Sequence, residues 1–515
     1  MKILTSEAMA RLDRRASVHF AVPSILLMEN AAIAVVDALG ERFPAAQEVA
    51  ILCGPGNNGG DGLAILRHLV TRGYRAWAAH LTGGRVVQGD PRLQLDICRN
   101  FGLELFEVTS GEGLAEALER AREADCLVDA LFGTGLGRPL EGLFAEAVRG
   151  INALGRPVVA VDLPSGLDAS RGEIPGPHVV ADLTVTFATL KLAHVFPPAS
   201  EAAGEVAVAD LGVPGSLVEE SAGSLYLLEP QDVAAAFPPR RPDAHKGSHG
   251  HALLVAGGPG RAGAAVLAAR AAVRSGAGLV TVATPAAVRN PVDLGSLESM
   301  TLGLACDARG ELVAEAAEAI LEAAAGKTAL ALGPGLGRLP GAEEAIRRVV
   351  LGCPLPLVLD ADGLNAFEGR IEELASRPGP TVLTPHPGEM ARLLGCSSAE
   401  VQADRLAAAG RAAELASAVV VLKGQLSLIA EPGGRIWVNP TGNPGMASGG
   451  MGDVLTGMIA ALLAQGREPA LAASGAVYVH GAAGDAASKR RRAQALAASD
   501  LLEELPGAIA ATAEP

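Results

Sequence analysis

The stretch VAILCGPGNNGGDGLAILRHLV, residues 49–70, joins an apolar run to an amphipathic run through a glycine-rich loop. Residues 49–53 predict a buried β-strand, and residues 61–73 predict a helix. The glycines between them satisfy the spacing G-x-G-x-x-G, which in dinucleotide-binding domains brings a pyrophosphate to the start of a helix. A strand, a glycine-rich loop and a helix in this order indicate an α/β fold.

The rest of a nicotinamide-dependent oxidoreductase pattern is missing from this region. Residues 75–81 predict the next strand, which ends in AAHLTGG (78–84) without the carboxylate that would hold a ribose. A P-loop is excluded as well, because no G-K-[ST] follows the glycines. The loop instead offers two neighbouring amides, Asn57 and Asn58, and the carboxylate of Asp61 at the predicted helix start. A simple turn with an aspartate cap is the alternative.

The same alternation continues along the chain and predicts two α/β domains with parallel sheets. In the first part, helices are expected at 5–18, 24–41 and 141–153, and further strands at 126–132 and 157–164. The pattern lapses around 215–250, and residues 237–250, FPPRRPDAHKGSHG, predict a linker or a lead-in loop. Beyond it we expect strands at 251–258, 278–284, 328–337, 355–365, 381–390 and 418–430, and helices at 262–275, 311–325 and 399–416. We place the domains at 1–220 and 221–515.

Bulk composition excludes several classes of partner. The net charge is −15 and aromatic residues make up 3%, so neither a nucleic-acid surface nor an anionic-membrane surface is expected. The six cysteines form no C-x-x-C pair, which favours free thiols in a reducing cytosol. No apolar leader or long uncharged apolar stretch is present. We therefore expect a cytoplasmic protein that acts on small molecules.

Two carboxylates follow predicted strands of the first domain. Asp129 lies in VDALFGTGLGRP (128–139), and Asp162 lies in VDLPSGLD (161–168). The carboxyl ends of parallel strands meet at one edge, where open α/β sheets bind ligands. We therefore expect these carboxylates and the Asn57–Asp61 loop to form one site.

The segment NPTGNPGMASGGMGDVLTGMIAALLAQ, residues 439–465, predicts an anion site in the second domain. Gly449, Gly450 and Gly452 precede an apolar helix that is expected to begin near Asp453. Free amides at a helix start bind phosphate or an oxyanion, and Asp453 would lie against a neighbouring hydroxyl. Because it lies at a helix start, we expect a lowered pKa for Asp453. The alternative is a glycine-rich turn with an aspartate cap.

GPGNNGGDG, D-A-L-F-G-T-G-L-x-R and D-L-P-S-G-L-D together resemble the N-terminal domain of the bifunctional NAD(P)H-hydrate repair enzymes. The resemblance implies a Rossmann-like three-layer αβα domain that epimerises the R and S forms of hydrated NADH and NADPH. It implies a potassium ion held by Asn58, Asp129 and Ser165, and Asp162 as the catalytic acid or base. Lys191 is either a further polar group there or a structural lysine. The resemblance places the substrate on Asn57, Asn58, Gly59, Gly60, Asp61, Gly133, Thr134, Gly135, Leu136, Gly137, Arg138, Pro139 and Asp162.

The second domain resembles the ribokinase-like superfamily, and in particular the ADP- or ATP-dependent dehydratase half of the same family. The motifs are HKGSHGH (245–251), residues 260–282, GPGLG (333–337), DADGLN (360–365), TPHPGE (384–389) and KGQLSLI (423–429). The resemblance implies that ADP binds with Mg²⁺, and that Asp453 is catalytic. It places the adenine nucleotide on Lys423, Gly424, Gln425, Leu426, Ser427 and Gly452. It places the hydrated nicotinamide nucleotide on Ala264, Gly335 or Gly337, His386 and Asp453, with a buried, satisfied imidazole as the alternative for His386.

The implied reaction is metabolite repair. A phosphoryl group is transferred to the C6 hydroxyl of the S form and then eliminated, which restores NADH or NADPH. The rival interpretation is a ribokinase-like kinase for a vitamin-like alcohol, with a non-catalytic nucleotide-binding module ahead of it. The resemblance also implies a homo-oligomer, a tetramer or larger.

Overall fold

The computed structural model describes residues 1–513 and divides the chain into two compact units, which meet in sequence at Gly223 and Ser224. No helix in this described part combines the length and the apolar character that a membrane crossing requires. Each unit is built around its own sheet.

The first unit contains a seven-stranded parallel sheet in the order β4-β3-β2-β5-β6-β7-β9. A separate two-stranded parallel pair joins β1 to β8, with Ile3 opposite Leu190 and Leu4 opposite Lys191. The strands are β1 (Ile3–Leu4), β2 (Glu48–Cys53), β3 (Arg75–Leu81), β4 (Leu105–Val108), β5 (Cys126–Ala130), β6 (Val158–Val161), β7 (Leu183–Phe187), β8 (Leu190–Lys191) and β9 (Glu205–Ala209). The helices are α1 (Ser6–His19), α2 (Ser24–Arg42), α3 (Asn57–Thr71), α4 (Gly89–Asn100), α5 (Gly111–Ala121), α6 (Gly142–Leu154), α7 (Leu192–Val195), α8 (Ala199–Ala202) and α9 (Gly215–Glu219).

Two hydrophobic cores lie on opposite faces of this sheet. The apolar faces of α1, α2, α3 and α4 pack on one face, and those of α5 and α6 pack on the other. The central strand β2 contributes alternate residues to the two cores: Ile51 belongs to the first and Leu52 to the second. This is the expected three-layer αβα arrangement.

Helix α3 begins inside the glycine-rich loop, at Asn57, and the predicted start at residue 61 is wrong. A Cβ at Gly59 would lie 1.8 Å from the carbonyl oxygen of Gly54, and a Cβ at Gly62 would lie 2.7 Å from Sγ of Cys53. Glycine therefore lets the first turns of α3 pack directly against the end of β2. Asp61 lies in the second turn and is not the helix cap.

The second unit contains a ten-stranded mixed sheet in the order β10-β19-β18-β17-β16-β15-β14-β11-β12-β13, antiparallel only at β17-β18 and β18-β19. The strands are β10 (Leu225–Leu227), β11 (His251–Val255), β12 (Leu279–Pro285), β13 (Met300–Leu304), β14 (Ala329–Leu332), β15 (Leu357–Leu359), β16 (Thr381–Leu383), β17 (Val419–Leu422), β18 (Leu428–Ala430) and β19 (Ile436–Val438). The α-helices are α10 (Pro230–Val233), α11 (Ala262–Arg274), α12 (Arg289–Gly295), α13 (Ala316–Ala324), α14 (Pro340–Gly352), α15 (Asp362–Asn365), α16 (Pro387–Leu394), α17 (Ser398–Ala403), α18 (Arg405–Ala416), α19 (Met451–Ala464), α20 (Pro469–Arg491) and α21 (Ala498–Ala513). Short 3₁₀ segments are η1 (Ala234–Ala236), η2 (Lys246–His249), η3 (Ala286–Val288), η4 (Ile371–Ser376), η5 (Pro444–Met446) and η6 (Ala493–Ala495).

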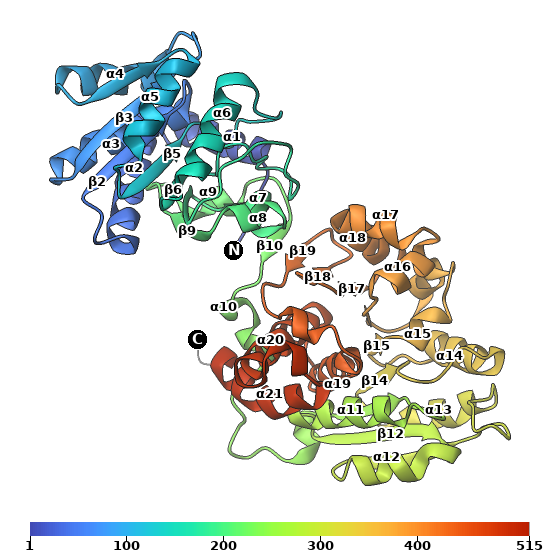
Figure 1. Ribbon diagram of the computed structural model, residues 1–515. Helices are drawn as coiled ribbons and strands as arrows, with labels where there is room; N and C mark the ends of the chain where they lie inside the picture. Colours follow the sequence, from blue (N-terminus) through green and yellow to red (C-terminus); the bar gives the residue numbers. More distant parts are fainter. Residues whose placement is uncertain (514–515) are drawn as a thin grey trace. The chain divides into compact units, whose positions relative to one another are not determined.

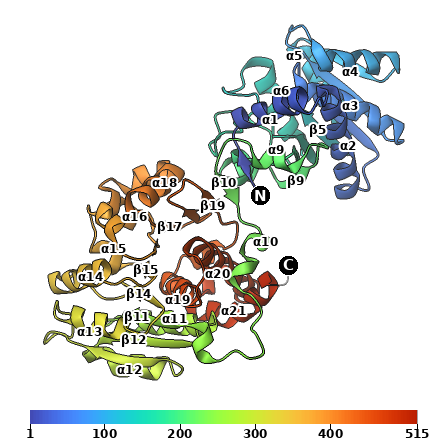
Figure 2. The same cartoon turned by 180° about the vertical axis from the view of Figure 1, so that it is seen from behind.

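One face of this sheet carries the helices α11, α19, α20 and α21, whose side chains form a single large core with the strands (Figure 1). Helix α19 is buried along most of its length. The segment 237–250 is not a linker between the units, because β10 already pairs with β19 ahead of it. It leads from η1 to β11 and passes beside α21 (Figure 2).

Two predicted helices differ from the observed ones. The helix expected at 311–325 begins only at Ala316, because Leu312 forms an isolated bridge with Cys306. The helix expected at 399–416 is two helices, α17 and α18. Asp404 separates them and caps the second, accepting a hydrogen bond from the amide of Ala407 at 2.9 Å.

Candidate active sites

A cavity of about 650 Å³ lies at the carboxyl edge of the first sheet. Its walls come from the loops that follow β2, β5 and β6 and from helices α1 and α2. The predicted residues that line it are Asn57, Asn58, Asp61, Gly133, Thr134, Gly135, Leu136 and Asp162. The other predicted residues of these loops, Gly59, Gly60, Gly137, Arg138 and Pro139, are not among its lining residues.

Asp162 follows β6 with a left-handed backbone, φ +65°. A non-glycine residue in this region is strained unless its surroundings hold it. They do: its amide donates to the carbonyl of Val185 at 2.8 Å, and its own carbonyl lies 2.9 Å from Nε2 of His194.

The carboxylate of Asp162 is paired with a fully buried lysine. Nζ of Lys191 donates to Oδ1 of Asp162 at 2.7 Å and to the hydroxyl of Thr186 at 2.7 Å. Burial alone would raise the pKa of Asp162, but Lys191 outweighs it and lowers the pKa below its usual value. Asp162 is therefore ionised at neutral pH, and Lys191 is a buried part of the cavity wall.

Asp61 shows the opposite shift in the same cavity. Burial, together with the nearby carboxylates of Asp162 and Asp13, raises the pKa of Asp61 well above its usual range. Two carboxyl groups with pKa values pushed apart are the pattern of an acid and base pair.

Asp129 and Ser165 form a buried cluster beside the cavity. Oδ1 of Asp129 accepts from the hydroxyl of Ser165 at 2.7 Å, and Oδ2 accepts from the amide of Ser165 at 2.8 Å. Burial raises the pKa of Asp129 to about 6, although the hydrogen bonds from Ser165 oppose the shift.

Asn58 lies beside Gly133, which belongs to the loop after β5. A Cβ at Gly133 would lie 3.0 Å from Oδ1 of Asn58 and 3.3 Å from Oδ2 of Asp162. Within residues 1–513, Nδ2 of Asn58 is buried without a hydrogen-bond partner. The structure thus brings Asn58 and Asp162 together on one side of the loop after β5.

Sequence reasoning missed the contribution of helix α1 and of the loop after β3. Asp13 and Ser17 on α1, and Arg85 and Val86 after β3, also line the cavity. No motif marked them. Asp13 and Ser17 lie on a helix without a glycine-rich or strand-end signal, and Arg85 and Val86 follow a strand end, AAHLTGG, that carries no carboxylate.

In the second unit, α19 begins at Met451, so Gly452 and Asp453 lie in its first turn. Gly450 has φ +90°, and a Cβ there would lie 2.7 Å from Cδ1 of Leu267. No side chain of the described residues caps this helix. Its first amides therefore have no side-chain cap, which is what the predicted anion site requires.

A buried ion pair lies beside this helix start. Nζ of Lys423 donates to Oδ1 of Asp360 at 2.8 Å, and Oδ2 of Asp360 accepts from the hydroxyl of Thr456 at 2.7 Å. A Cβ at Gly452 would lie 3.3 Å from Nζ of Lys423. Burial would lower the pKa of Lys423, but Asp360 and Glu389 outweigh it and raise the pKa. A permanent positive charge therefore lies at the start of α19.

The expected lowering of the Asp453 pKa is wrong. Burial raises the pKa to about 6, Asp360 and Asp362 add to the rise, and Lys423 only partly opposes it. Desolvation and neighbouring carboxylates therefore outweigh the helix start.

His386 is half exposed and is not a buried imidazole. It caps α16, where Nδ1 accepts from the amide of Gly388 at 3.0 Å. Gly335 lies near α11, since a Cβ there would come within 3.4 Å of Cβ of Ala264. The amide of Gly337 donates to Asp362 at 2.8 Å. Residues Lys423–Ser427 form the turn between β17 and β18.

Fold and sites together define a two-domain α/β enzyme with a separate acidic site in each domain. Residues 24–193 match the family model described as YjeF-related protein N-terminus, and residues 252–507 match the model described as NAD(P)H-hydrate dehydratase.

A bifunctional NAD(P)H-hydrate repair enzyme of Moorella thermoacetica is 43% identical over 98% of this chain and 96% of its own length. The enzyme of that name from Escherichia coli is 34% identical over 93% of this chain and 88% of its own length. The chain belongs to the family of bifunctional NAD(P)H-hydrate repair enzymes.

Solved structures support the fold of the second unit. An ADP/ATP-dependent NAD(P)H-hydrate dehydratase from Bacillus subtilis, co-crystallised with ATP and Mg²⁺, is 35% identical with a TM-score of 0.50, over 56% of this chain and 100% of its own. A ribokinase-like superfamily protein from Enterococcus faecalis has the same TM-score at 27% identity, over 57% of this chain and 98% of its own. The second unit therefore has the expected ribokinase-like fold.

Proposed function

We propose that the chain repairs hydrated NADH and NADPH, with an epimerase in residues 1–220 and an ADP-dependent dehydratase in residues 221–515. The observation that carries this proposal is an aspartate near a lysine in each unit. Asp162 pairs with buried Lys191, and Asp453 lies at the start of α19, where the charge of Lys423 acts on it. The names of the full-length relatives support the same pair of activities.

In the first cavity, the hydrated nicotinamide ring lies between the α3 start and the loop after β5. The amides of Asn57 and Asn58 and the backbone of residues 133–136 contact the nucleotide. Asp61 protonates the departing C6 hydroxyl, and Asp162 takes the proton from the returning water. Loss and return of the oxygen on opposite faces interconverts the epimers. The raised pKa of Asp61 and the lowered pKa of Asp162 support these roles.

We propose that the oxygens of Asn58, Asp129 and Ser165 would hold a potassium ion, since Asp129 and Ser165 are already in contact at 2.7 Å. Buried Asp129 has no cationic side chain paired with it in the described part of the chain, and its raised pKa reflects this uncompensated charge. Amide, carboxylate and hydroxyl oxygens suit a hard cation. A bound potassium ion would offset the negative charge of Asp129 in this buried place.

Thermal unfolding tests the potassium site. Because folding raises the Asp129 pKa from 3.8 to about 6, this group makes the fold less stable as pH rises through that range. Potassium should offset this loss, so it should raise the Tm of the first unit more at pH 8 than at pH 5. Tetramethylammonium is the control cation, and Asp129→Asn should abolish the difference. An equal effect of both cations would contradict the site.

In the second unit, Asp453 takes the proton of the C6 hydroxyl as that oxygen attacks the terminal phosphoryl group of ADP. The bond from this phosphorus to the bridging oxygen breaks, and AMP leaves. The amides of the first turn of α19, including Gly452, and Lys423 stabilise the charge on the transferred phosphoryl group. Departure of phosphate with the C5 proton restores the C5=C6 bond. The substrate is held by Ala264, by His386 and by either Gly335 or Gly337. The adenine nucleotide is held by residues Lys423–Ser427. Mg²⁺ bound to the nucleotide neutralises phosphate charge, which agrees with the ATP and Mg²⁺ of the Bacillus subtilis structure.

The rival vitamin-kinase interpretation leaves the first unit without a role. It is not favoured, because both units match the repair-enzyme family. Free cysteines throughout the described chain favour a cytoplasmic location, and we propose a homo-oligomer, a tetramer or larger.

The decisive experiment incubates the protein with mixed epimers of hydrated NADH and ADP, and follows recovery of near-ultraviolet absorbance. Full recovery is expected. Recovery of only the S fraction would remove the epimerase assignment, and phosphorylation of an alcohol without NADH recovery would remove the dehydratase assignment.

A further inference from the structure

A second cavity, of about 790 Å³, lies in the second unit far from Asp453. Its walls come from the loop ahead of β11, from Gly276 ahead of β12 and from Gln465 after α19. These are the amino ends of the strands and the carboxyl end of the helix, whereas Asp453 lies at the start of that helix. The 14-residue length of α19 separates the two places by about 20 Å.

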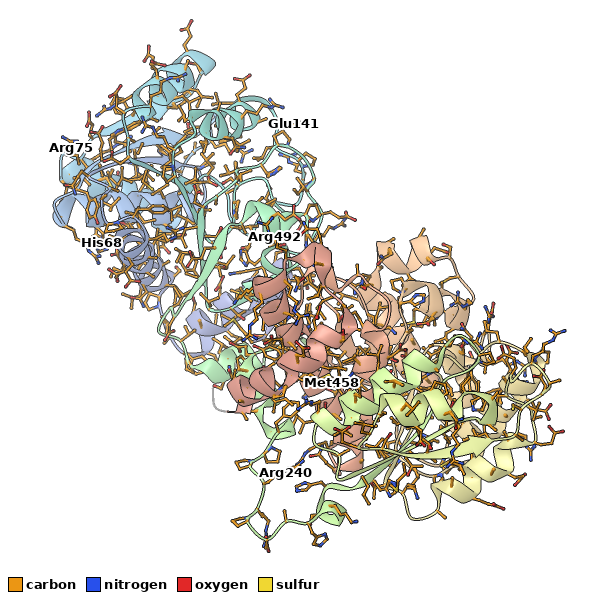
Figure 3. All side chains as sticks on the ribbon, turned by 60° about the horizontal axis from the view of Figure 1, so that its bottom comes forward. His68, Arg75, Glu141, Arg240, Met458 and Arg492 are labelled. Atoms are coloured by element: carbon orange, nitrogen blue, oxygen red, sulfur yellow. The ribbon has the colours of Figure 1, made fainter. Side chains whose placement is uncertain are left out.

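The cavity concentrates positive charge in an acidic chain. Arg240, Arg274 and Arg467 line it, together with His245 and His249. None of these three arginines forms an ion pair with any carboxylate of residues 1–513, whereas neighbouring Arg241 is neutralised by Asp243 at 2.9 Å. Figure 3 shows Arg240 on the loop that leads to β11. Unpaired arginines in a concave site attract anions and bind phosphate through their guanidinium groups.

Three residues of the cavity wall each have a buried polar atom without a hydrogen-bond partner among the described residues. Ser275 is 3% exposed, and its hydroxyl has no hydrogen-bond partner among the described residues. The same is true of Nε of Arg467 and Nε2 of His249. Buried polar groups are nearly always satisfied in native proteins, so three such atoms in one wall leave hydrogen-bonding capacity unused beside the cavity.

The cavity wall is preformed. The amide of Gly278 donates to the carbonyl of His249 at 3.0 Å, and Nη2 of Arg240 donates to the carbonyl of Gly276 at 2.9 Å. Gly250 has φ +71°, and a Cβ there would lie 1.8 Å from the carbonyl oxygen of Ala464. The lead-in loop is therefore held against β12 and the end of α19.

We propose that this cavity binds a phosphate-bearing small molecule, a nucleotide or a free polyphosphate, at a site separate from the dehydratase centre. Arg274, Arg467 and Arg240 hold the phosphates. Phe237, Pro506 and Ile509 supply an apolar wall, which suits the base of a nucleotide. The volume lies in the range of small-molecule sites.

Equilibrium dialysis of the full-length protein with labelled ADP and with labelled inorganic pyrophosphate tests the proposal. We expect a class of binding sites in addition to the dehydratase centre, weakened about tenfold by Arg274→Gln and further by Arg274→Gln with Arg467→Gln. Arg270→Gln is the matched control, because Arg270 is exposed on the same helix α11 and does not line the cavity. Turnover at the dehydratase centre should be unchanged in all three variants.

The two probes separate the sources of phosphate. If ADP binds the additional site more tightly than pyrophosphate does, the ligand of this site is a nucleotide. If the two probes bind with equal affinity, the ligand is a free polyphosphate. A single class of sites for both probes would overturn the proposal. Unchanged binding in Arg274→Gln, or equal weakening in Arg270→Gln, would overturn it as well.

Discussion

Asp162 combines a strained backbone with a charge-paired side chain, and both follow from its position after β6. Sequence motifs located the residue, but neither its positive φ nor its contact with Lys191 could be predicted, because Lys191 follows β7 and is 29 residues away. The direction of the turn between β7 and β8 decides whether the Lys191 side chain reaches Asp162.

Asp162→Asn should slow exchange of the hydrated NADH epimers by roughly a hundredfold to ten-thousandfold, because the amide cannot accept the proton. The measurement is nuclear magnetic resonance of the two epimers at equilibrium. Asp168→Asn is the control, since Asp168 belongs to the same loop but does not line the cavity. An unchanged exchange rate in Asp162→Asn would remove its role.

Dehydration should depend on the ionised form of Asp453. Its pKa of about 6 means that the rate falls about tenfold per pH unit below pH 6 and levels off above pH 7. Initial rates from pH 5 to 8 with S epimer and ADP check this, with protein stability measured at each pH. A rate that rises toward low pH would contradict proton acceptance by Asp453.

At the scale of elements, the central strands of both sheets were predictable because buried parallel strands are short apolar runs bounded by glycine or proline. The strands β4, β7, β9, β10, β13 and β19 were not predicted. Helix starts were harder. The glycines of residues 54–62 suggested a loop, yet they form the beginning of α3, since close packing on β2 needs residues without side chains. Helix propensity disfavours glycine there, and tertiary packing overrides it.

Gly59→Ala should destabilise the first unit by about 3 kcal/mol, because the added methyl would meet the backbone of Gly54. Gly56→Ala is the matched control, since nothing lies within 4 Å of a Cβ there. The free energy of unfolding of both variants is measured by chemical denaturation, with the loss of epimerase activity as the signal. Equal stability of the two would show that α3 does not pack on Gly54 in this way.

At the scale of the whole molecule, two domains and two sites were predictable from the restart of the strand and helix alternation. The place of residues 237–250 was not, because a proline-rich basic segment is equally typical of a linker and of a loop held by tertiary contacts. Strand β10 and helix α10, ahead of it, are too short to give a periodic signal.

A fragment that begins at Ser224 should fold and dehydrate the S epimer. A fragment that begins at Arg240 loses β10 and the buried side chains of Leu228, Val233 and Phe237. That loss should cost roughly 5 kcal/mol, so the shorter fragment should aggregate or melt well below the longer one in calorimetry. Equal melting of the two fragments would restore the interpretation of 237–250 as a linker.

The pairing of β1 with β8 has a practical consequence for anyone who handles this protein. Leu4 lies opposite Lys191, and the Lys2 ammonium donates to the carbonyls of Glu219 and Ser221. A purification handle fused ahead of residue 2, or a protease that trims the first few residues, acts on β1, which pairs with the strand that carries the lysine of the first cavity. Immobilisation chemistry should therefore avoid the leading amino group.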